Sequence, residues 1–143
     1  MRSLNRIGPT LARINGVNAL TDVTGFGLLG HLTEIMTASA LDAEISWSQI
    51  PKLSNLEHYV EEECVPGGTG RNYASIAKHL PILSETQCAI LCDPQTSGGL
   101  LVTVEPGAIN EVAAILEGAG LPFNPIGRLS QQLSQKATLK LSD

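Results

Sequence analysis

The stretch Asn18-Ala-Leu-Thr-Asp-Val-Thr-Gly-Phe-Gly-Leu-Leu-Gly-His31 contains the strongest local pattern in the sequence. A short apolar run leads to Asp22 and then to a glycine-rich turn. After the turn, apolar residues between Leu28 and Met36 recur at helical spacing. The pattern predicts a strand, a turn and a helix. Asp22 is then expected at the carboxyl end of the strand, where open α/β sheets collect their ligands.

Three interpretations of this turn remain open from spacing alone. Turn amides and a helix N-terminus favour a nearby anion, so that Asp22 would hold a divalent cation against a phosphate. The run from Gly25 to Gly30 also matches the dinucleotide pattern G-x-G-x-x-G, with Glu44 at about the distance of the ribose-binding acid. The third interpretation is a plain tight turn in which Thr24 caps the helix. The polar strand end argues against the dinucleotide, because buried parallel strands are almost wholly apolar.

Composition limits the classes of protein to consider. The 143 residues fit one domain, 1–143, large enough to fold without a disulfide or metal staple. A formal net charge of −5 argues against nucleic-acid binding, and no apolar run is long enough to cross a bilayer. No signal peptide is visible, so a cytoplasmic location is expected. Cys88 and Cys92 have no partner at zinc spacing, and they are predicted to be small buried apolar side chains.

Helices and strands alternate along the whole chain. Helices are predicted over 2–14, 28–40, 55–63, 73–79, 84–91 and 108–117, and strands over 17–23, 43–47, 99–104, 125–129 and 138–141. Ser84 and Gln87 match a capping box at the start of one helix. This order of elements indicates an α+β or mixed α/β fold.

Two further loops are candidate sites. The predicted glycine-rich loop 65–72 combines flexible amides, a hydroxyl and a guanidinium, which together suit a phosphate or another anion. Its candidate residues are Gly67, Gly68, Thr69, Arg71 and Asn72. A sharp turn, with Thr69 capping a helix and Arg71 in an ion pair, is an equally good interpretation.

The loop 93–98 is a weaker candidate, represented by Thr96, Ser97 and Gly98 as a cleft wall. Neither hydroxyl has an activating base in the sequence, so nucleophilic catalysis is not expected from them. The simpler interpretation is a loop held by Asp93 and the two hydroxyls. His31, near the start of the second helix, is expected to serve packing or to lie at the surface.

Three motifs together resemble one family. Thr21-Asp-Val-Thr-Gly-Phe-Gly-Leu-Leu-Gly-His31, Val65-Pro-Gly-Gly-Thr-Gly-Arg-Asn72 and Leu91-Cys-Asp-Pro-Gln-Thr-Ser-Gly-Gly-Leu100 resemble the C-terminal half of the selenophosphate synthetase (selenide, water dikinase) family, in its order and spacing. The resemblance extends from Ser3 to Leu129. The family is part of the aminoimidazole ribonucleotide synthetase superfamily. The resemblance excludes the dinucleotide interpretation and implies a four-stranded mixed β-sheet flanked by helices.

The resemblance also implies a function for a longer protein. Members of the selenophosphate synthetase family make selenophosphate, AMP and phosphate from ATP, selenide and water. Asp22 matches the position where the C-terminal domain adds one carboxylate to a Mg²⁺ cluster over the ATP phosphates. The catalytic Cys and Lys, the other Mg²⁺ ligands and the dimerising ATP site are expected in an N-terminal ATP-binding domain that this sequence lacks. The full-length enzyme is expected to be a homodimer, and the isolated chain to be inactive.

Two alternatives to this function remain. The chain could be a stand-alone binding or regulatory module that keeps the fold without the chemistry. It could also be a domain of a sister enzyme, such as thiamine-monophosphate kinase or the hydrogenase-maturation dehydratase. The sequences of the second and third motifs favour selenophosphate synthetase over these sister enzymes.

Overall fold

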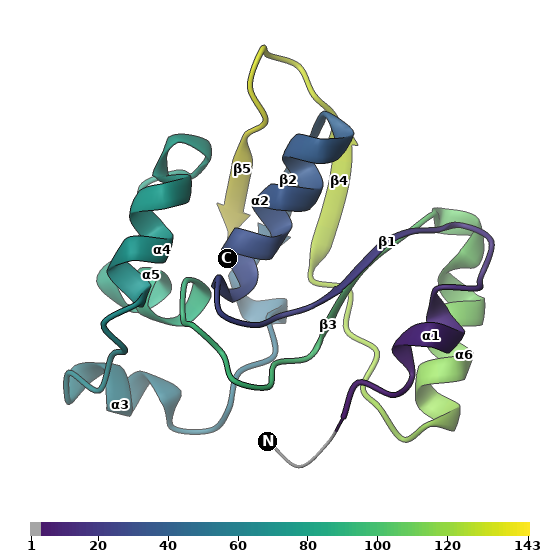
Figure 1. Cartoon of the computed structure of the whole chain (residues 1–143), viewed down its shortest axis with the longest axis horizontal. Helices are drawn as coiled ribbons and strands as arrows, with labels where there is room; N and C mark the ends of the chain where they lie inside the picture. The colour runs from purple at the N-terminus through teal and green to yellow at the C-terminus, as the bar shows by residue number, and fades with distance from the viewer. Residues whose placement is uncertain (1–3) are drawn as a thin grey trace.

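The computed structural model describes residues 4–143 (Figure 1). Its helices are α1 (Gly8–Leu11), α2 (Gly27–Ser39), α3 (Leu56–Glu61), α4 (Thr69–Ile76), α5 (Glu85–Leu91) and α6 (Ile109–Gly118). Its strands are β1 (Val17–Asp22), β2 (Leu41–Ser46), β3 (Leu100–Val104), β4 (Gly127–Gln131) and β5 (Leu139–Ser142). None of the helices described is both long and apolar enough to cross a membrane.

The strands form two separate sheets. β1 pairs antiparallel with β3, and β2 lies between β4, which is antiparallel to it, and β5, which is parallel. The predicted α+β class is confirmed, but a pair and a three-stranded sheet replace the single four-stranded sheet that the resemblance implies. Both edges of β2 are occupied by β4 and β5, so β2 has no free edge for β1 or β3 to join.

Helices α1 and α6 lie on one side of the β1–β3 pair and α2, α4 and α5 on the other (Figure 1). The structure has two apolar cores, one in each of these halves. In the larger core, α2 packs Leu29, Leu32 and Met36 with Ile45 of β2 and Leu139 of β5. The smaller core joins α1 and α6, and its buried members are Leu11, Ile14, Ala108 and Val112. The β1–β3 pair therefore connects the two halves, and the turn after β1 leads directly into the larger core.

Most predicted elements are present with shifted ends. The capping box is confirmed: the Ser84 hydroxyl accepts from the Gln87 backbone N–H at 3.1 Å, and Gln87 Oε1 accepts from the Ser84 backbone N–H at 2.9 Å. The helix predicted over 2–14 shrinks to α1, with Pro9 in its first turn, where a proline is tolerated. The start of that prediction, at residues 2 and 3, lies outside the described residues.

The loop predicted over 65–72 is wrong in its second half. Helix α4 begins at Thr69, after Gly68 at the N-cap position, so Thr69 to Asn72 form its first turn. A turn bond from the Thr69 N–H to the Pro66 carbonyl, at 3.0 Å, starts the helical path. Clustered glycines predict a loop by their average preference, but here only the two glycines before Thr69 lie outside the helix.

Candidate functional site

The first and third motifs meet through backbone hydrogen bonds. The Val23 N–H donates to the Gly99 carbonyl at 2.9 Å, and the Gly98 N–H donates back to the Val23 carbonyl at 3.1 Å. One step further along, the Gln95 N–H donates to the Thr24 carbonyl at 3.0 Å. The loop before β3 is therefore fixed against the turn after β1.

The second motif joins them through one side chain. The Asn72 side-chain amide donates to the Gly25 carbonyl at 2.8 Å and to the Cys92 carbonyl at 3.0 Å. Because Gly25 belongs to the first motif and Cys92 to the third, all three motifs meet at Asn72. We call the segments 22–27, 67–72 and 92–99 together the motif junction.

Two glycines of the junction are explained by close packing. Gly27 has a φ of +73°, and a Cβ there would lie 2.8 Å from the carbonyl carbon of Cys92. A Cβ on Gly98 would collide with the Val23 carbonyl oxygen and the Gln95 side chain. Both positions need glycine because backbone segments approach each other closely. Gly25 and Gly67, in contrast, have open space where a Cβ would stand.

His31 supports the turn from inside helix α2. The Thr24 N–H donates to His31 Nε2 at 3.2 Å, and His31 Nδ1 lies 3.3 Å from Glu34 Oε2. Because Nε2 accepts a hydrogen bond, the ring proton of neutral His31 belongs on Nδ1, facing Glu34. His31 is 7% exposed and lies 5.7 Å from the Phe26 ring. The packing interpretation of this histidine is therefore confirmed.

Thr24 does not cap helix α2. Gly27 is the first helical residue, Phe26 occupies the N-cap position, and no side chain bonds there. Gly25 and Phe26 separate Thr24 from the helix, so its hydroxyl lies instead 3.3 Å from His31 Nε2. The plain-turn interpretation is thus correct about a tight turn and wrong about the cap.

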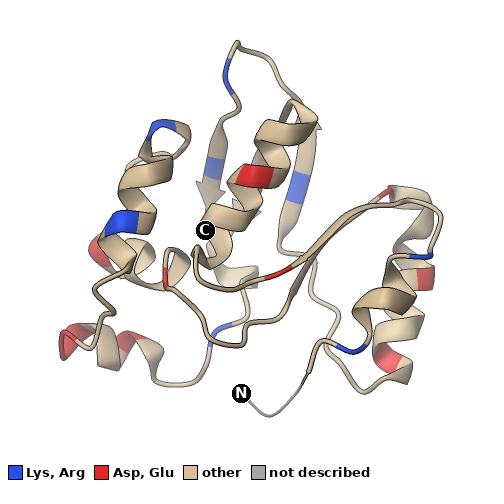
Figure 2. Cartoon of the chain, in the orientation of Figure 1, with Lys and Arg blue, Asp and Glu red and all other residues tan. Residues whose placement is uncertain are grey.

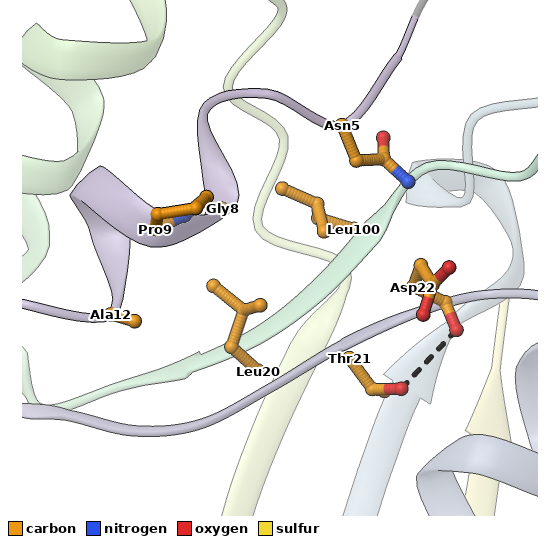
Figure 3. Close-up of a pocket in the computed structure, with 8 residues that line it drawn as sticks. All are labelled: Asn5, Gly8, Pro9, Ala12, Leu20, Thr21, Asp22 and Leu100. Carbon is orange, nitrogen blue, oxygen red and sulfur yellow. Dashed lines mark hydrogen bonds between the residues drawn. The ribbon is translucent and has the colours of Figure 1, made fainter.

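Asp22 lies at the end of β1, as predicted, and is exposed. It lines a pocket of about 430 Å³ (Figure 3) whose other walls are Asn5, Gly8, Pro9, Ala12, Leu20, Thr21 and Leu100. Asp22 is the acidic residue of β1, and neither β1 nor β3 carries a Lys or Arg. Figure 2 accordingly shows a red segment and no blue one on this strand pair. The Asp22 carboxylate thus faces the pocket without a cationic residue on its own strand pair.

A complete metal site is not formed within the described residues. No group of three or more His, Cys, Asp or Glu side chains gathers there in a way that could hold a metal ion. Mg²⁺ takes six oxygen ligands in near-octahedral geometry, commonly one or two carboxylates with waters and substrate phosphates. An exposed carboxylate at a pocket rim fits one such ligand. Asp22 therefore suits a shared site and not a site built by this chain alone.

The predicted anion residues are brought together, but in another arrangement. Arg71 Nη1 donates to the Gly67 carbonyl at 3.2 Å, and the Asn72 amide is used within the junction. The Thr69 hydroxyl is buried without a partner in the described part of the chain. The N–H groups of Gly67 and Gly68 donate to no acceptor within residues 4–143. These two N–H groups are therefore available to an anion, beside the exposed Arg71.

The third motif is held by backbone and by asparagine side chains. Asn5 donates to the Gly98 carbonyl at 3.2 Å, while Thr96 and Ser97 are exposed. The expectation that Asp93 and these hydroxyls hold the loop is wrong, since none of the three bonds to another residue within 4–143. Partial burial instead raises the pKa of the Asp93 carboxyl.

The cysteines fit the structural interpretation. Cys92 is buried and Cys88 is half-buried, and both are free. Burial raises the pKa of Cys92 to about 12 and also raises that of Cys88, so neither is an activated thiol.

The sequence does not predict the bonds that join the motifs. From sequence, Asn72 is a candidate anion ligand and Asn5 is not a candidate. One local signal exists, because an asparagine carboxamide readily bonds nearby backbone groups in turns. No pattern in the sequence indicates which carbonyl, 47 or 20 residues away, is the acceptor.

Comparison with known proteins supports the fold and the family. The family model of the AIR synthase related protein, C-terminal domain, matches residues 1–140. The selenide, water dikinase of Photorhabdus laumondii is 46% identical over 143 residues, which are 100% of this chain and 41% of the relative. That of Shewanella putrefaciens is 52% identical over 135 residues, 94% of this chain and 38% of the relative. The chain thus spans about two fifths of the length of these relatives.

Two solved structures share the fold. Thiamine-monophosphate kinase from Stenotrophomonas maltophilia has a TM-score of 0.54 at 19% identity, covering 87% of this chain and 31% of that one. The E. coli hydrogenase maturation protein HypE has a TM-score of 0.53 at 22% identity, covering 93% and 33%. At such identities the likeness concerns the fold alone. With the family model matching nearly every residue, the chain belongs to the AIR synthase related protein family, as a C-terminal domain of it.

Proposed function

We propose that this chain is the C-terminal domain of a selenide, water dikinase, which makes selenophosphate, AMP and phosphate from ATP, selenide and water. The supporting observation is the 46–52% identity to proteins of that name across 92–100% of the chain. The rest of such an enzyme, more than half of its length, would supply the ATP-binding domain and the catalytic Cys and Lys. The assembled enzyme would be a cytoplasmic homodimer.

Asp22 is the residue through which this domain would take part in the chemistry. Its carboxylate would give one oxygen ligand to a Mg²⁺ that the N-terminal domain also binds. The bound cation would neutralise charge on the ATP phosphates, the main electrostatic demand of phosphoryl transfer. The exposure of Asp22 at the pocket rim supports this role, as does the absence of Lys and Arg from β1 and β3. The motif junction would fix the turn that follows Asp22.

The amides of Gly67 and Gly68 would form a second, weaker contact. They precede helix α4, and a helix N-terminus favours negative charge. A phosphate oxygen at the cleft wall would suit these free N–H groups, with the exposed Arg71 beside them. Thr96 and Ser97 would lie on the same wall with exposed hydroxyls, and the proposal gives them no part in a chemical step.

A reconstitution experiment tests the proposed function. The full-length enzyme carrying this domain is incubated with ATP, Mg²⁺ and selenide, and the AMP and selenophosphate formed are measured. Replacing selenide with thiamine monophosphate tests the sister-enzyme alternative. Formation of selenophosphate supports the proposal. Turnover of thiamine monophosphate alone supports the sister enzyme, and the absence of any turnover supports a binding or regulatory module.

A further inference from the structure

We propose that Asn72 is a positioning residue, whose side-chain amide holds the turn after Asp22 in the geometry that the reaction needs. This inference rests on the proposed function, because it assigns Asn72 a part in the same site. It differs from the anion role predicted from sequence, since the amide group faces two backbone carbonyls of the protein.

The geometry uses the full donor capacity of the side chain. An asparagine –NH₂ group has two N–H donors, and the two acceptors lie at 2.8 Å on Gly25 and at 3.0 Å on Cys92. These carbonyls belong to segments far apart in sequence, which a single backbone bond from α4 could not join. Aspartate has nearly the same shape but only acceptors when ionised, so it cannot replace this contact.

Other contacts hold the turn on different sides. His31, in α2, accepts a hydrogen bond from the Thr24 N–H, and the Gln95 N–H donates to the Thr24 carbonyl. Asn72 alone among the described side chains binds the exposed Gly25, beside Phe26, which is 57% exposed. Loss of Asn72 would therefore free the outer half of the turn, three residues from Asp22, while leaving both cores intact.

Movement of the turn after loss of the Asn72 contact would affect the rate of catalysis more than the stability of the fold. Displacing a catalytic group by about 1 Å can cost about 100-fold in rate, because the reacting groups must be held at near-contact geometry. Asn72 is half-buried in the first turn of α4 and is in neither core cluster. We therefore assign Asn72 to the placement of the turn, and its replacement should lower kcat.

Asn72→Asp in the full-length enzyme is the sharpest variant. An acidic residue in the first turn of a helix is favourable for the helix, so a defect cannot come from loss of α4. Asn110→Asp is the matched control, because exposed Asn110 lies in the first turn of α6 and its side chain has no hydrogen bond within residues 4–143. kcat, the KM for ATP and the melting temperature are measured for both variants, with Asn72→Ala as a second test.

We expect Asn72→Asp and Asn72→Ala to lower kcat about 10- to 100-fold, with a change in the KM for ATP of under about threefold. Asn110→Asp should match the wild type. An unchanged kcat in the Asn72 variants would overturn the proposal. It would also be overturned if activity fell only in proportion to the folded fraction, since that marks a purely structural residue.

Amide hydrogen exchange in the full-length enzyme separates the proposal from the function on which it rests. The Gly27 N–H donates to the Thr24 carbonyl at 3.0 Å within the turn. In Asn72→Asp, this amide should exchange at least about tenfold faster, while amides of α6 keep the wild-type rate. If the wild-type enzyme makes no selenophosphate, the proposed function fails, and exchange still reports whether Asn72 holds the turn. Unchanged exchange at Gly27 contradicts the positioning role directly.

Discussion

The imidazole of His31 accepts a hydrogen bond from the backbone N–H of Thr24, seven residues earlier, at 3.2 Å. This bond ties the turn after Asp22 to the helix that follows it. An N–H that loses its acceptor where water cannot replace it costs about 1–3 kcal/mol, and the Thr24 N–H is partly buried. His31 therefore stabilises the fold at the point where the candidate site begins.

The first prediction follows from this bond. His31→Phe keeps an aromatic ring but removes the acceptor, and we expect it to lower the free energy of unfolding by about 1–3 kcal/mol. His31→Gln keeps an acceptor oxygen and should lose less. Chemical denaturation of the two variants measures the difference. The control is His58→Phe on exposed α3, which should leave stability within about 0.5 kcal/mol; equal losses in all three variants would contradict the assigned role.

Asp42 gives a prediction for the pH dependence of stability. Its carboxylate accepts from the N–H groups of Thr138 at 2.8 Å and Leu133 at 3.1 Å, which lower its pKa below 3.8. The lowered pKa in the folded state means that Asp42 stabilises the fold above pH 3.8 and loses this effect as the pH falls through the folded pKa. The contact holds the connection between β4 and β5.

Thermal melts of wild type and Asp42→Asn at pH 7 and between pH 4 and 2 test this. The variant should melt lower than wild type at pH 7, and the difference should shrink as the pH falls below 3.8. Glu57→Gln on α3 is the control and should follow the wild-type profile. A difference between Asp42→Asn and wild type that stays constant with pH would show that these hydrogen bonds do not stabilise the fold.

Local features of the fold could be predicted from sequence, and long-range ones could not. The capping box of Ser84 and Gln87, and helix α2 with its apolar spacing, depend on residues a few positions apart. The pairing of β1 with β3 joins Asp22 to Leu100, and no pattern within either strand identifies that partner. The two-sheet arrangement, in place of a single sheet, depends on which distant strands pair with β2.

The candidate site shows the same division. The position of Asp22 at the end of β1 is confirmed, because a polar residue ending an apolar run marks a strand end. The sequence predicts Gly98 only as part of a cleft wall, whereas Gly27 and Gly98 are needed for backbone packing. The chemistry of Arg71 and Asn72 suits either an anion site or a sharp turn, and in the structure both donate to backbone carbonyls of the protein.

The isolated chain should fold but make no selenophosphate. It has two buried cores, while no described group of side chains could hold a metal ion alone. Incubation with ATP, Mg²⁺ and selenide should release no AMP above background. Release at an enzyme-like rate of at least about 1 s⁻¹ would contradict the need for a second domain. Circular dichroism of the same sample confirms that the chain is folded during the assay.

The amides before α4 should respond to anions. Titration with phosphate should shift the NMR signals of the Gly67 and Gly68 amides, and that of Thr69 less, because its N–H already bonds Pro66. Arg71→Gln should weaken the response by removing the nearby positive charge. Lys78→Gln, just beyond the other end of α4, removes the same charge as a control. If the chemical shifts of these amides do not change up to high millimolar phosphate, the segment does not bind anions and only starts the helix.

The last prediction concerns Asp22 itself. In the full-length enzyme, Asp22→Asn should cut turnover about 100- to 1,000-fold, because loss of one preorganised electrostatic contact in a transition state costs about 3–4 kcal/mol. Its melting temperature should change little, because Asp22 is exposed and the fold makes no use of its carboxylate within residues 4–143. Turnover and melting temperature are measured together, with Asn18→Ala on the same strand as the control. Normal turnover of Asp22→Asn would show that Asp22 takes no part in the site. Lost turnover with a large drop in melting temperature would make Asp22 a structural turn residue, since an exposed metal ligand has no reason to stabilise the metal-free fold.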